Sequence, residues 1–252
     1  MTHDLATDAN ENLRRAFVTL AEEAPPGEAR QFGPLAAASA GLPVPFYNRV
    51  FIFESPPADE LSAAVAWMSE RNVPFWVTVT EPVVEAIKEH LADLNLVKAT
   101  EQPGMAMASL DEILPRNSAA DIAEVTDTDE LDDFNRVAAS VFRTPLDVAE
   151  QVYQVALVGD EKRLFLGRVN GYPAACGLLI QSGDVAGVYT IGVSEEFRRQ
   201  GIGEVMSWEV LRAGREAGCH VGVLQSSDMA YPLYKKMGFK TVVTYHHFES
   251  GD

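Results

Sequence analysis

The sequence has few cysteines, few histidines and few basic residues. Its 252 residues include only 2 cysteines, too few for a disulfide framework or a thiolate metal site, so Cys176 and Cys219 are expected to be buried free thiols. The 5 histidines are scattered without ligand spacing, which disfavours a metal site. Acidic residues outnumber basic ones 37 to 20, and the net charge of −17 argues against binding to nucleic acid or an anionic membrane.

No apolar run is long enough to cross a membrane. The longest candidate, residues 32–46, is interrupted by two glycines and three prolines, and the polar residues 1–15 lack the layout of a signal peptide. We therefore expect a cytoplasmic protein. Composition alone does not separate a salt-adapted source from an ordinary acidic protein.

The remaining sequence is organised around residues 185–239. An apolar strand over residues 185–193 leads into a loop that carries Arg198 and Arg199 and enters a helix through Gly201 and Gly203. Glycines at a helix start let an anion approach the free N–H groups of the first turn, where the helix dipole also favours negative charge. This pattern predicts a binding loop for a phosphorylated cofactor.

Two common phosphate loops do not fit these residues. The dinucleotide fingerprint requires a third glycine where this chain has Met206, and the nucleotide P-loop requires Gly-Lys where it has Gly203-Glu204. The pattern R-x-x-G-x-G from Arg198, followed by Leu-Tyr-Lys-Lys-Met-Gly-Phe at residues 233–239, resembles the GNAT superfamily of N-acetyltransferases. The resemblance covers residues 121–248, about half of the chain.

The resemblance implies acetyl-coenzyme A as cosubstrate. It implies that the loop grips the pyrophosphate and that the preceding strand pairs with the pantetheine arm. The residues so assigned to the cofactor are Ile191, Gly192, Val193, Arg198, Arg199, Gln200, Gly201, Ile202, Gly203 and Ser227. Ser227 stands where the family often carries asparagine. Gly192 either permits a bulge and close approach of the cofactor or only eases packing against a neighbour.

Tyr234 is the candidate for protonating the departing thiolate. A free thiol titrates near pH 8.5 and a phenol near pH 10, so a positioned phenol stays protonated at neutral pH. No general base is identified. Some family members carry glutamate on the strand equivalent to residues 185–193, and this chain has none. Glu195 and Glu196 are expected to be solvated, one of His246 and His247 can face the cleft, and a relayed water is an equal alternative.

The first half repeats the strand-helix order of the second. Its apolar pattern predicts strands at residues 49–53 and 75–80, helices at 58–71 and 82–94, and extended pieces near Val97 and Met105. Residues 91–96 align with residues 234–239, which places Asn95 opposite Gly238 at the end of a helix. Where the phosphate loop belongs, residues 54–58 have neither arginine nor glycine. We interpret this order as an internal repeat. The alternative is that the two halves share it by coincidence, because alternating strands and helices are common in α/β proteins.

The other predicted elements complete a two-domain organisation. They are a helix at 10–23, a connection at 32–46, a linker at 111–120, a strand at 122–125, helices at 129–142 and 145–157, and a hairpin of strands 163–169 and 174–180 across Asn170-Gly171. The fold class expected from the resemblance is α/β (α+β), a GNAT-type mixed central sheet flanked by helices. We expect two tandem domains: residues 1–115, GNAT-like but without a cofactor loop, and residues 116–252, the catalytic domain.

The predicted function is transfer of an acetyl group from acetyl-CoA to a primary amine of a small molecule or peptide. The alternative is a non-catalytic acyl-CoA-binding or interaction protein. An acidic surface attracts cationic acceptors such as a polyamine, an aminoglycoside or a lysine-containing peptide, although any acidic protein does so. We expect a monomer or homodimer without nucleic-acid or membrane partners.

Overall fold

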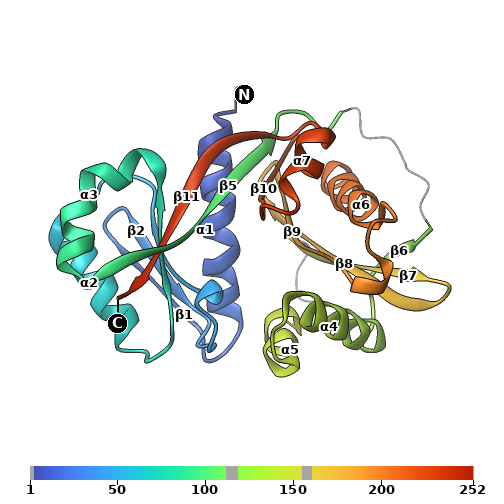
Figure 1. Ribbon diagram of the computed structural model, residues 1–252, viewed down its shortest axis with the longest axis horizontal. Coiled ribbons are helices and arrows are strands. Elements are labelled where there is room, and N and C mark those ends of the chain that lie inside the picture. Colours follow the sequence, from blue (N-terminus) through green and yellow to red (C-terminus); the bar gives the residue numbers. More distant parts are fainter. Residues whose placement is uncertain (1–2, 112–118, 155–160, 252) are drawn as a thin grey trace.

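The computed structural model describes residues 3–111, 119–154 and 161–251. In this part of the chain, an 11-stranded mixed sheet runs through the whole molecule in the order β1-β2-β3-β4-β11-β5-β10-β9-β8-β7-β6. Helices flank the sheet on both faces (Figure 1). The mixed α/β architecture predicted from the sequence is therefore confirmed. None of the described helices is both long and apolar enough to span a membrane.

The first half begins with a long helix and then builds five strands. Its elements are α1 (Leu5–Glu23), β1 (Glu28–Phe32), β2 (Leu35–Ser39), η1 (Pro45–Tyr47), β3 (Asn48–Ile52), α2 (Ala58–Ser69), β4 (Trp76–Thr80), α3 (Glu81–Asp93) and β5 (Leu96–Met107). Helix α1 starts earlier than the expected residue 10 because the side chain of Asp4 accepts hydrogen bonds from the N–H groups of Ala6 and Thr7.

One expectation for this half is wrong. Residues 32–46 are not a plain connection, because β2 lies within them and pairs with β1 and β3. Its alanine-rich sequence has little intrinsic strand preference, but all five residues of β2 are buried, and such packing decides strand formation. The extended pieces predicted near Val97 and Met105 are confirmed, and both belong to one continuous strand, β5.

The second half follows the predicted order closely. Its elements are β6 (Asp121–Glu124), α4 (Thr128–Phe142), α5 (Leu146–Gln154), β7 (Lys162–Val169), β8 (Tyr172–Ser182), β9 (Val185–Val193), η3 (Glu195–Phe197), α6 (Ile202–Glu216), β10 (Val221–Gln225), α7 (Tyr231–Met237) and β11 (Lys240–Ser250). The hairpin between β7 and β8 is confirmed, and Asn170 and Gly171 both have positive φ angles, 51° and 83°, as its tight turn requires.

The two halves exchange their final strands. Strand β5, the last of the first half, lies between β10 and β11 and is antiparallel to both. Strand β11, the last of the second half, lies between β4 and β5. In Figure 1 both long strands cross the middle of the molecule. Each half therefore completes the sheet of the other. The predicted domain boundary at residue 115 falls within residues 112–118, outside the described residues, as does most of the predicted linker.

The internal repeat is visible in the pairing and in the helix ends. Strands β3 and β4 pair in parallel across α2, and β9 and β10 pair in parallel across α6. Asn95 after α3 has a φ angle of 52°, and Gly238 after α7 has one of 105°. Both residues thus adopt the left-handed conformation expected at a helix C-terminus.

Helix α1 joins the hydrophobic cores of the two halves. It stands between them in Figure 1, and Leu13 and Phe17 belong to a buried cluster that includes Phe51 of the first half and Phe134 of the second. Asn12, which is also buried, donates from Nδ2 to the carbonyl of Ile180 at 3.0 Å. Separate clusters lie under α2 and α3 and under α6 and α7.

The two cysteines are buried free thiols, as expected. Burial raises the pKa of Cys176 to about 12 and that of Cys219 to about 11. Both side chains are therefore protonated at neutral pH and poorly nucleophilic.

Candidate active site

The loop between β9 and α6 forms a concave set of backbone N–H groups. Arg199 and Gly201 have positive φ angles of 60° and 79°. When residues with positive φ alternate with residues with negative φ, successive backbone N–H groups point toward the same side of the loop. Gly201 is the N-cap of α6, and no side chain caps this helix start. The side chain of Arg198 stabilises the loop, because its Nε donates a hydrogen bond to the carbonyl of Val193 at 3.0 Å. These free donors suit a pyrophosphate.

Open space lies in front of the first turn of α6. A Cβ atom at Gly201 would meet nothing within 4 Å, and one at Gly203 would meet only Cγ2 of Val193 at 3.6 Å. Packing within the protein therefore does not require glycine at position 203. Arg198, Arg199 and Gln200 are exposed beside this space, whereas Ile202 is buried and anchors the helix. The loop thus fits the phosphate groups of coenzyme A.

Strand β9 is bulged immediately before this loop. Its register with β8 shifts between Tyr189 and Gly192, and Thr190 has a φ angle of 52°, which is strained for a β-branched side chain. The Thr190 hydroxyl lies 3.4 Å from that of Tyr153, and the Thr190 carbonyl accepts from Sγ of Cys176 at 3.3 Å. The distortion is therefore held in place by its surroundings, and it falls on Thr190 rather than on Gly192.

Gly192 has a packing role of its own. A Cβ atom there would lie 2.9 Å from Sγ of Cys176 and 2.9 Å from Cγ1 of Val141. We expect Gly192→Ala to destabilise the fold by about 1–3 kcal/mol through overpacking. Gly203→Ala is the matched control and should leave stability nearly unchanged. Urea unfolding of both variants checks this, and equal stabilities would show that position 192 has room for a side chain.

Tyr234 lies in α7 and is only 6% exposed. Its ring packs edge-on against Phe239 with 5.7 Å between centroids. Burial raises the pKa of its phenol, and a contact with Ser207 offsets part of this rise. Tyr234 is therefore protonated at neutral pH. Ser227, just before α7, accepts from the N–H of Ala230 at 3.4 Å and so also caps the turn.

A cavity of about 440 Å³ brings these residues together with the first half of the chain. From the predicted site it contains Ile191, Ser227 and Tyr234, whereas the phosphate loop does not line it. The second half also contributes Phe142, Thr144, Val152, Tyr153, Lys162, Leu178, Ile180, Val188, Tyr189, Thr190, Gln225 and Ala230. The first half contributes Ala16, Phe17, Leu20, Val44, Phe46, Tyr47 and Gln102.

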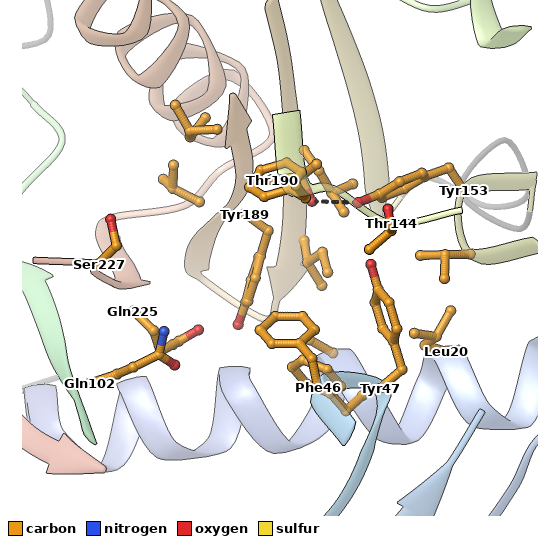
Figure 2. A pocket seen from close by; sticks show the side chains of 18 of the residues that line it. Leu20, Phe46, Tyr47, Gln102, Thr144, Tyr153, Tyr189, Thr190, Gln225 and Ser227 are labelled. Atoms are coloured by element: carbon orange, nitrogen blue, oxygen red, sulfur yellow. Dashed lines mark hydrogen bonds between the residues drawn. The ribbon is translucent and has the colours of Figure 1, made fainter. Parts of the chain in front are cut away.

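The wall supplied by the first half is largely aromatic. Figure 2 shows Phe46 beside Tyr189, and Tyr47 reaching toward Tyr153 and Thr144. No motif in this half assigns it a role in binding. Phe46 and Tyr47 form a short aromatic pair directly after the proline-rich segment, and this pair is the signal that could have indicated a binding surface.

The titratable groups on the cavity wall are four tyrosines and a lysine. Burial raises the pKa of Tyr47, Tyr153 and Tyr189, as it does that of Tyr234. Burial lowers the pKa of Lys162, which pairs with Glu23. Among the described lining residues, none is an aspartate, glutamate or histidine. The wall is therefore neutral apart from the paired Lys162.

Neither candidate histidine lines the cavity. His247 is fully buried and stacks on Trp76 with 4.7 Å between centroids. Its Nδ1 lies 3.1 Å from the Thr78 hydroxyl, and its Nε2 lies 3.2 Å from Oε1 of Gln102. Burial lowers the pKa of His247 to about 2, so it is a very weak base. His246 pairs with Glu101 at 3.6 Å, and burial lowers its pKa as well.

Comparison with known proteins agrees with this geometry. Residues 128–239 match the family model "Acetyltransferase (GNAT) family". A GCN5-related N-acetyltransferase from Kribbella flavida has a similar structure, with a TM-score of 0.72 at 17% identity, and the match covers 96% of each chain. A tandem GNAT protein from the clavulanic acid biosynthesis pathway matches with a TM-score of 0.60 at 13% identity, over 100% of this chain and 97% of that one.

A functionally unknown conserved protein from Staphylococcus epidermidis also matches, with a TM-score of 0.64 at 18% identity, over 90% of this chain and 95% of that one. At these identities the structural matches establish the fold and not a substrate. No curated protein matches the sequence.

Proposed function

Residues 128–239 form an acetyltransferase domain of the GNAT family, and from this premise we propose that the protein transfers the acetyl group of acetyl-CoA to a primary amine held between its two halves. The observation that carries the proposal is the concave loop at the start of α6, which opens beside Gly203. Its N–H groups suit the pyrophosphate of the cosubstrate, and the bulged end of β9 leads from the loop to the cavity that Tyr234 lines.

In this proposal each half of the protein has a separate task. The second half grips the cosubstrate through Arg198, Arg199 and the glycines of the loop. The first half provides the aromatic wall against which the acceptor lies. The division into residues 1–115 and 116–252 remains a proposal about sequence boundaries, because the exchanged strands β5 and β11 bind the halves into one sheet.

The chemistry requires a neutral amine and a protonated leaving group. Bound acetyl-CoA supplies an acetyl group activated as a thioester. The amine nitrogen forms the new bond to the carbonyl carbon as the carbon–sulfur bond breaks. Tyr234 gives its proton from Oη to the sulfur, and the proton lost by the nitrogen restores the phenol. The raised pKa of Tyr234 keeps this proton available throughout the neutral range.

Calorimetry with acetyl-CoA and a thiol-release assay with a panel of amines test the proposal together. We expect binding and release of free coenzyme A with at least one amine. Failure to bind acetyl-CoA would end the acetyltransferase proposal. Binding without thiol release from any amine would instead support the alternative, a non-catalytic acyl-CoA-binding protein.

The pH dependence of kcat/KM should be set by the pKa of the acceptor amine and not by a titrating group of the protein. The tyrosines that line the cavity have raised pKa values, so they remain protonated while a free amine loses its proton. We expect log kcat/KM to rise with pH with a slope of about one until the pKa of the amine is reached. Two acceptors whose amines differ in pKa should give inflections that differ by the same amount. An inflection that stays constant between acceptors would indicate a general base in the protein.

The charge of Arg199 should contribute to cosubstrate affinity less strongly than the loop backbone. The side chain is exposed, and loss of one such contact in Arg199→Ala should weaken acetyl-CoA binding about tenfold to thirtyfold. The defect should shrink as salt concentration rises, because salt screens the contact in the original protein. Calorimetry in increasing KCl measures this trend. A defect that is independent of salt would mean that Arg199 acts by packing.

A further inference from the structure

Strand β3 carries a buried arginine without a charged partner. Arg49 is 1% exposed, and its Nε donates to the carbonyl of Phe46 at 2.8 Å. Its Nη1 is buried without a hydrogen-bond partner, and no carboxylate among the described residues forms an ion pair with it. Desolvation lowers the pKa of Arg49 to about 9, which leaves the side chain charged at neutral pH. A buried unpaired charge of this kind is costly for the fold.

The guanidinium lies against the aromatic wall of the cavity. Its Cζ is 4.3 Å from the ring centroid of Phe17 and 4.4 Å from that of Phe46, and both rings line the cavity. Cation–π contacts of this kind contribute about 0.5–2 kcal/mol each, whereas a buried ion loses several kcal/mol of hydration. A third ring, that of Trp76, lies 5.2 Å from Cζ. The three rings offset part of the cost, and the guanidinium would still gain from an anionic partner.

Two further donors lie in the surroundings of Arg49. Oη of Tyr245 is buried and makes no hydrogen bond in the described part of the chain, and Nε2 of Gln225, a cavity residue, is buried close to the Tyr189 hydroxyl. Burial raises the pKa of Tyr189, and the contact with Gln225 and then the charge of Arg49 counteract this rise. Burial also raises the pKa of Tyr245, and the charge of Arg49 again counteracts the rise. Figure 2 shows Gln225 next to Gln102 and below Tyr189 at this end of the cavity. We call Arg49, Gln225 and Tyr245 the donor cluster.

We propose that the acceptor amine also carries a carboxylate, which binds at the donor cluster while the amine points toward Tyr234. The inference rests on the proposed acetyl transfer and narrows its substrate class. Donors directly behind the aromatic wall and a neutral cavity in front of it match an amino acid or an ω-amino carboxylate. Arg49 itself does not line the cavity, so in this proposal the ring of Phe46, which contacts Arg49 and is 36% exposed, must shift to let the carboxylate reach the guanidinium.

This acceptor differs from the cationic ones that net charge alone suggests. A polyamine or aminoglycoside would place additional positive charge near Arg49 and near a wall without acidic side chains among its described residues. The field of the acidic surface does not repel an acceptor that carries both an amine and a carboxylate, because its net charge is near zero.

The test compares straight-chain ω-amino carboxylates of increasing length with their matched primary amides. In the unmodified protein, kcat/KM from thiol release should favour the best carboxylate over its amide by about tenfold to a hundredfold. In Arg49→Met the ratio should fall to about one, and in Arg49→Lys part of the preference should return. Equal values for carboxylate and amide in the unmodified protein would overturn the inference while leaving acetyl transfer intact.

A binding measurement separates this inference from the proposed function. The N-acetylated carboxylates, added without acetyl-CoA, should raise the unfolding temperature of the unmodified protein and not that of Arg49→Met. If this occurs but no amine releases thiol, the carboxylate site stands and the acetyl transfer fails. If the unfolding temperature of the unmodified protein does not change with any of these compounds, the donor cluster is not a carboxylate site.

Two control variants distinguish a role of Arg49 in binding from a role in stabilising the fold. Arg49→Met should retain or raise the unfolding temperature, because it removes a desolvated charge and keeps an apolar side chain of similar length. Tyr245→Phe removes a hydroxyl that has no partner, so it should fold normally and lower the carboxylate preference severalfold. If Arg49→Met unfolds and Tyr245→Phe keeps the full preference, Arg49 serves the fold alone and the inference is wrong.

Discussion

Replacement of Tyr234 by phenylalanine is expected to lower kcat by about 10²- to 10⁴-fold, the range of a general acid. The substitution keeps the ring, its edge-on contact with Phe239 and its burial. It removes only the hydroxyl whose pKa burial raises. The KM for acetyl-CoA should therefore change little, since the hydroxyl acts on the departing sulfur and not on the bound cosubstrate. Steady-state kinetics on the best acceptor measures both parameters.

Tyr231 in the same helix provides a matched control. Its hydroxyl lies 3.1 Å from that of Thr241, and Tyr231 does not line the cavity. Tyr231→Phe should thus retain nearly full activity. If Tyr234→Phe turns over like the unmodified protein, Tyr234 is not the proton donor, and the acid must be sought among water or other groups of the cavity wall.

Gly203→Val should weaken binding of acetyl-CoA by about a hundredfold or more, equivalent to roughly 2.7 kcal/mol. In the protein alone, a side chain at this position meets open space beyond Cγ2 of Val193. A branched side chain would instead occupy the volume into which phosphate oxygens must approach the N–H groups of α6. The effect should exceed that of Arg199→Ala, which removes one exposed charge and leaves the backbone donors in place. Calorimetric titration of both variants checks this order.

A graded series makes the steric origin testable. Gly203→Ala adds only the Cβ atom and should have an intermediate affinity for acetyl-CoA. Unfolding temperatures of all three proteins should agree closely, because position 203 has no tight neighbour. Wild-type affinity in Gly203→Val would mean that the loop is an ordinary strand-to-helix connection, and the acetyltransferase proposal would lose its main support.

Local patterns predicted much of the second half. The glycine and arginine spacing between β9 and α6, the Asn170-Gly171 turn and the glycine after α7 each fix a backbone conformation through short-range sterics, and each lies where the sequence placed it. The repeat in the first half was visible for the same reason, because Asn95 tolerates the left-handed conformation required after α3.

Long-range features could not be predicted from local patterns. Strand β2 is alanine-rich and forms because it is buried between β1 and β3. The exchange of β5 and β11 depends on pairings between strands more than 130 residues apart, such as Thr241 with Met105. The aromatic wall depends on the position of α1 between the halves, so the aromatic pair Phe46-Tyr47 alone did not show that the first half contributes to the cavity.

The pattern of apolar residues in the sequence also does not show which groups several buried polar side chains contact. His246 and His247 alternate on β11, which suggested that one of them faces a cleft. Instead, His247 is buried against Trp76 and His246 pairs with Glu101, so neither side chain lines the cavity. Arg49 is buried in a strand, as an apolar core residue would be. It is unusual only because its Nη1 has no hydrogen-bond partner, which the sequence does not show.

Mass spectrometry of the acceptor after incubation with acetyl-CoA and the protein tests the central claim most directly. We expect an ω-amino carboxylate to gain one acetyl group on its amine, and we expect Tyr234→Phe and Gly203→Val each to suppress this product. If the protein binds acetyl-CoA but leaves every amine of the panel unmodified, it is not an acetyltransferase for this class of acceptor, and the role proposed for the cavity between its halves is contradicted.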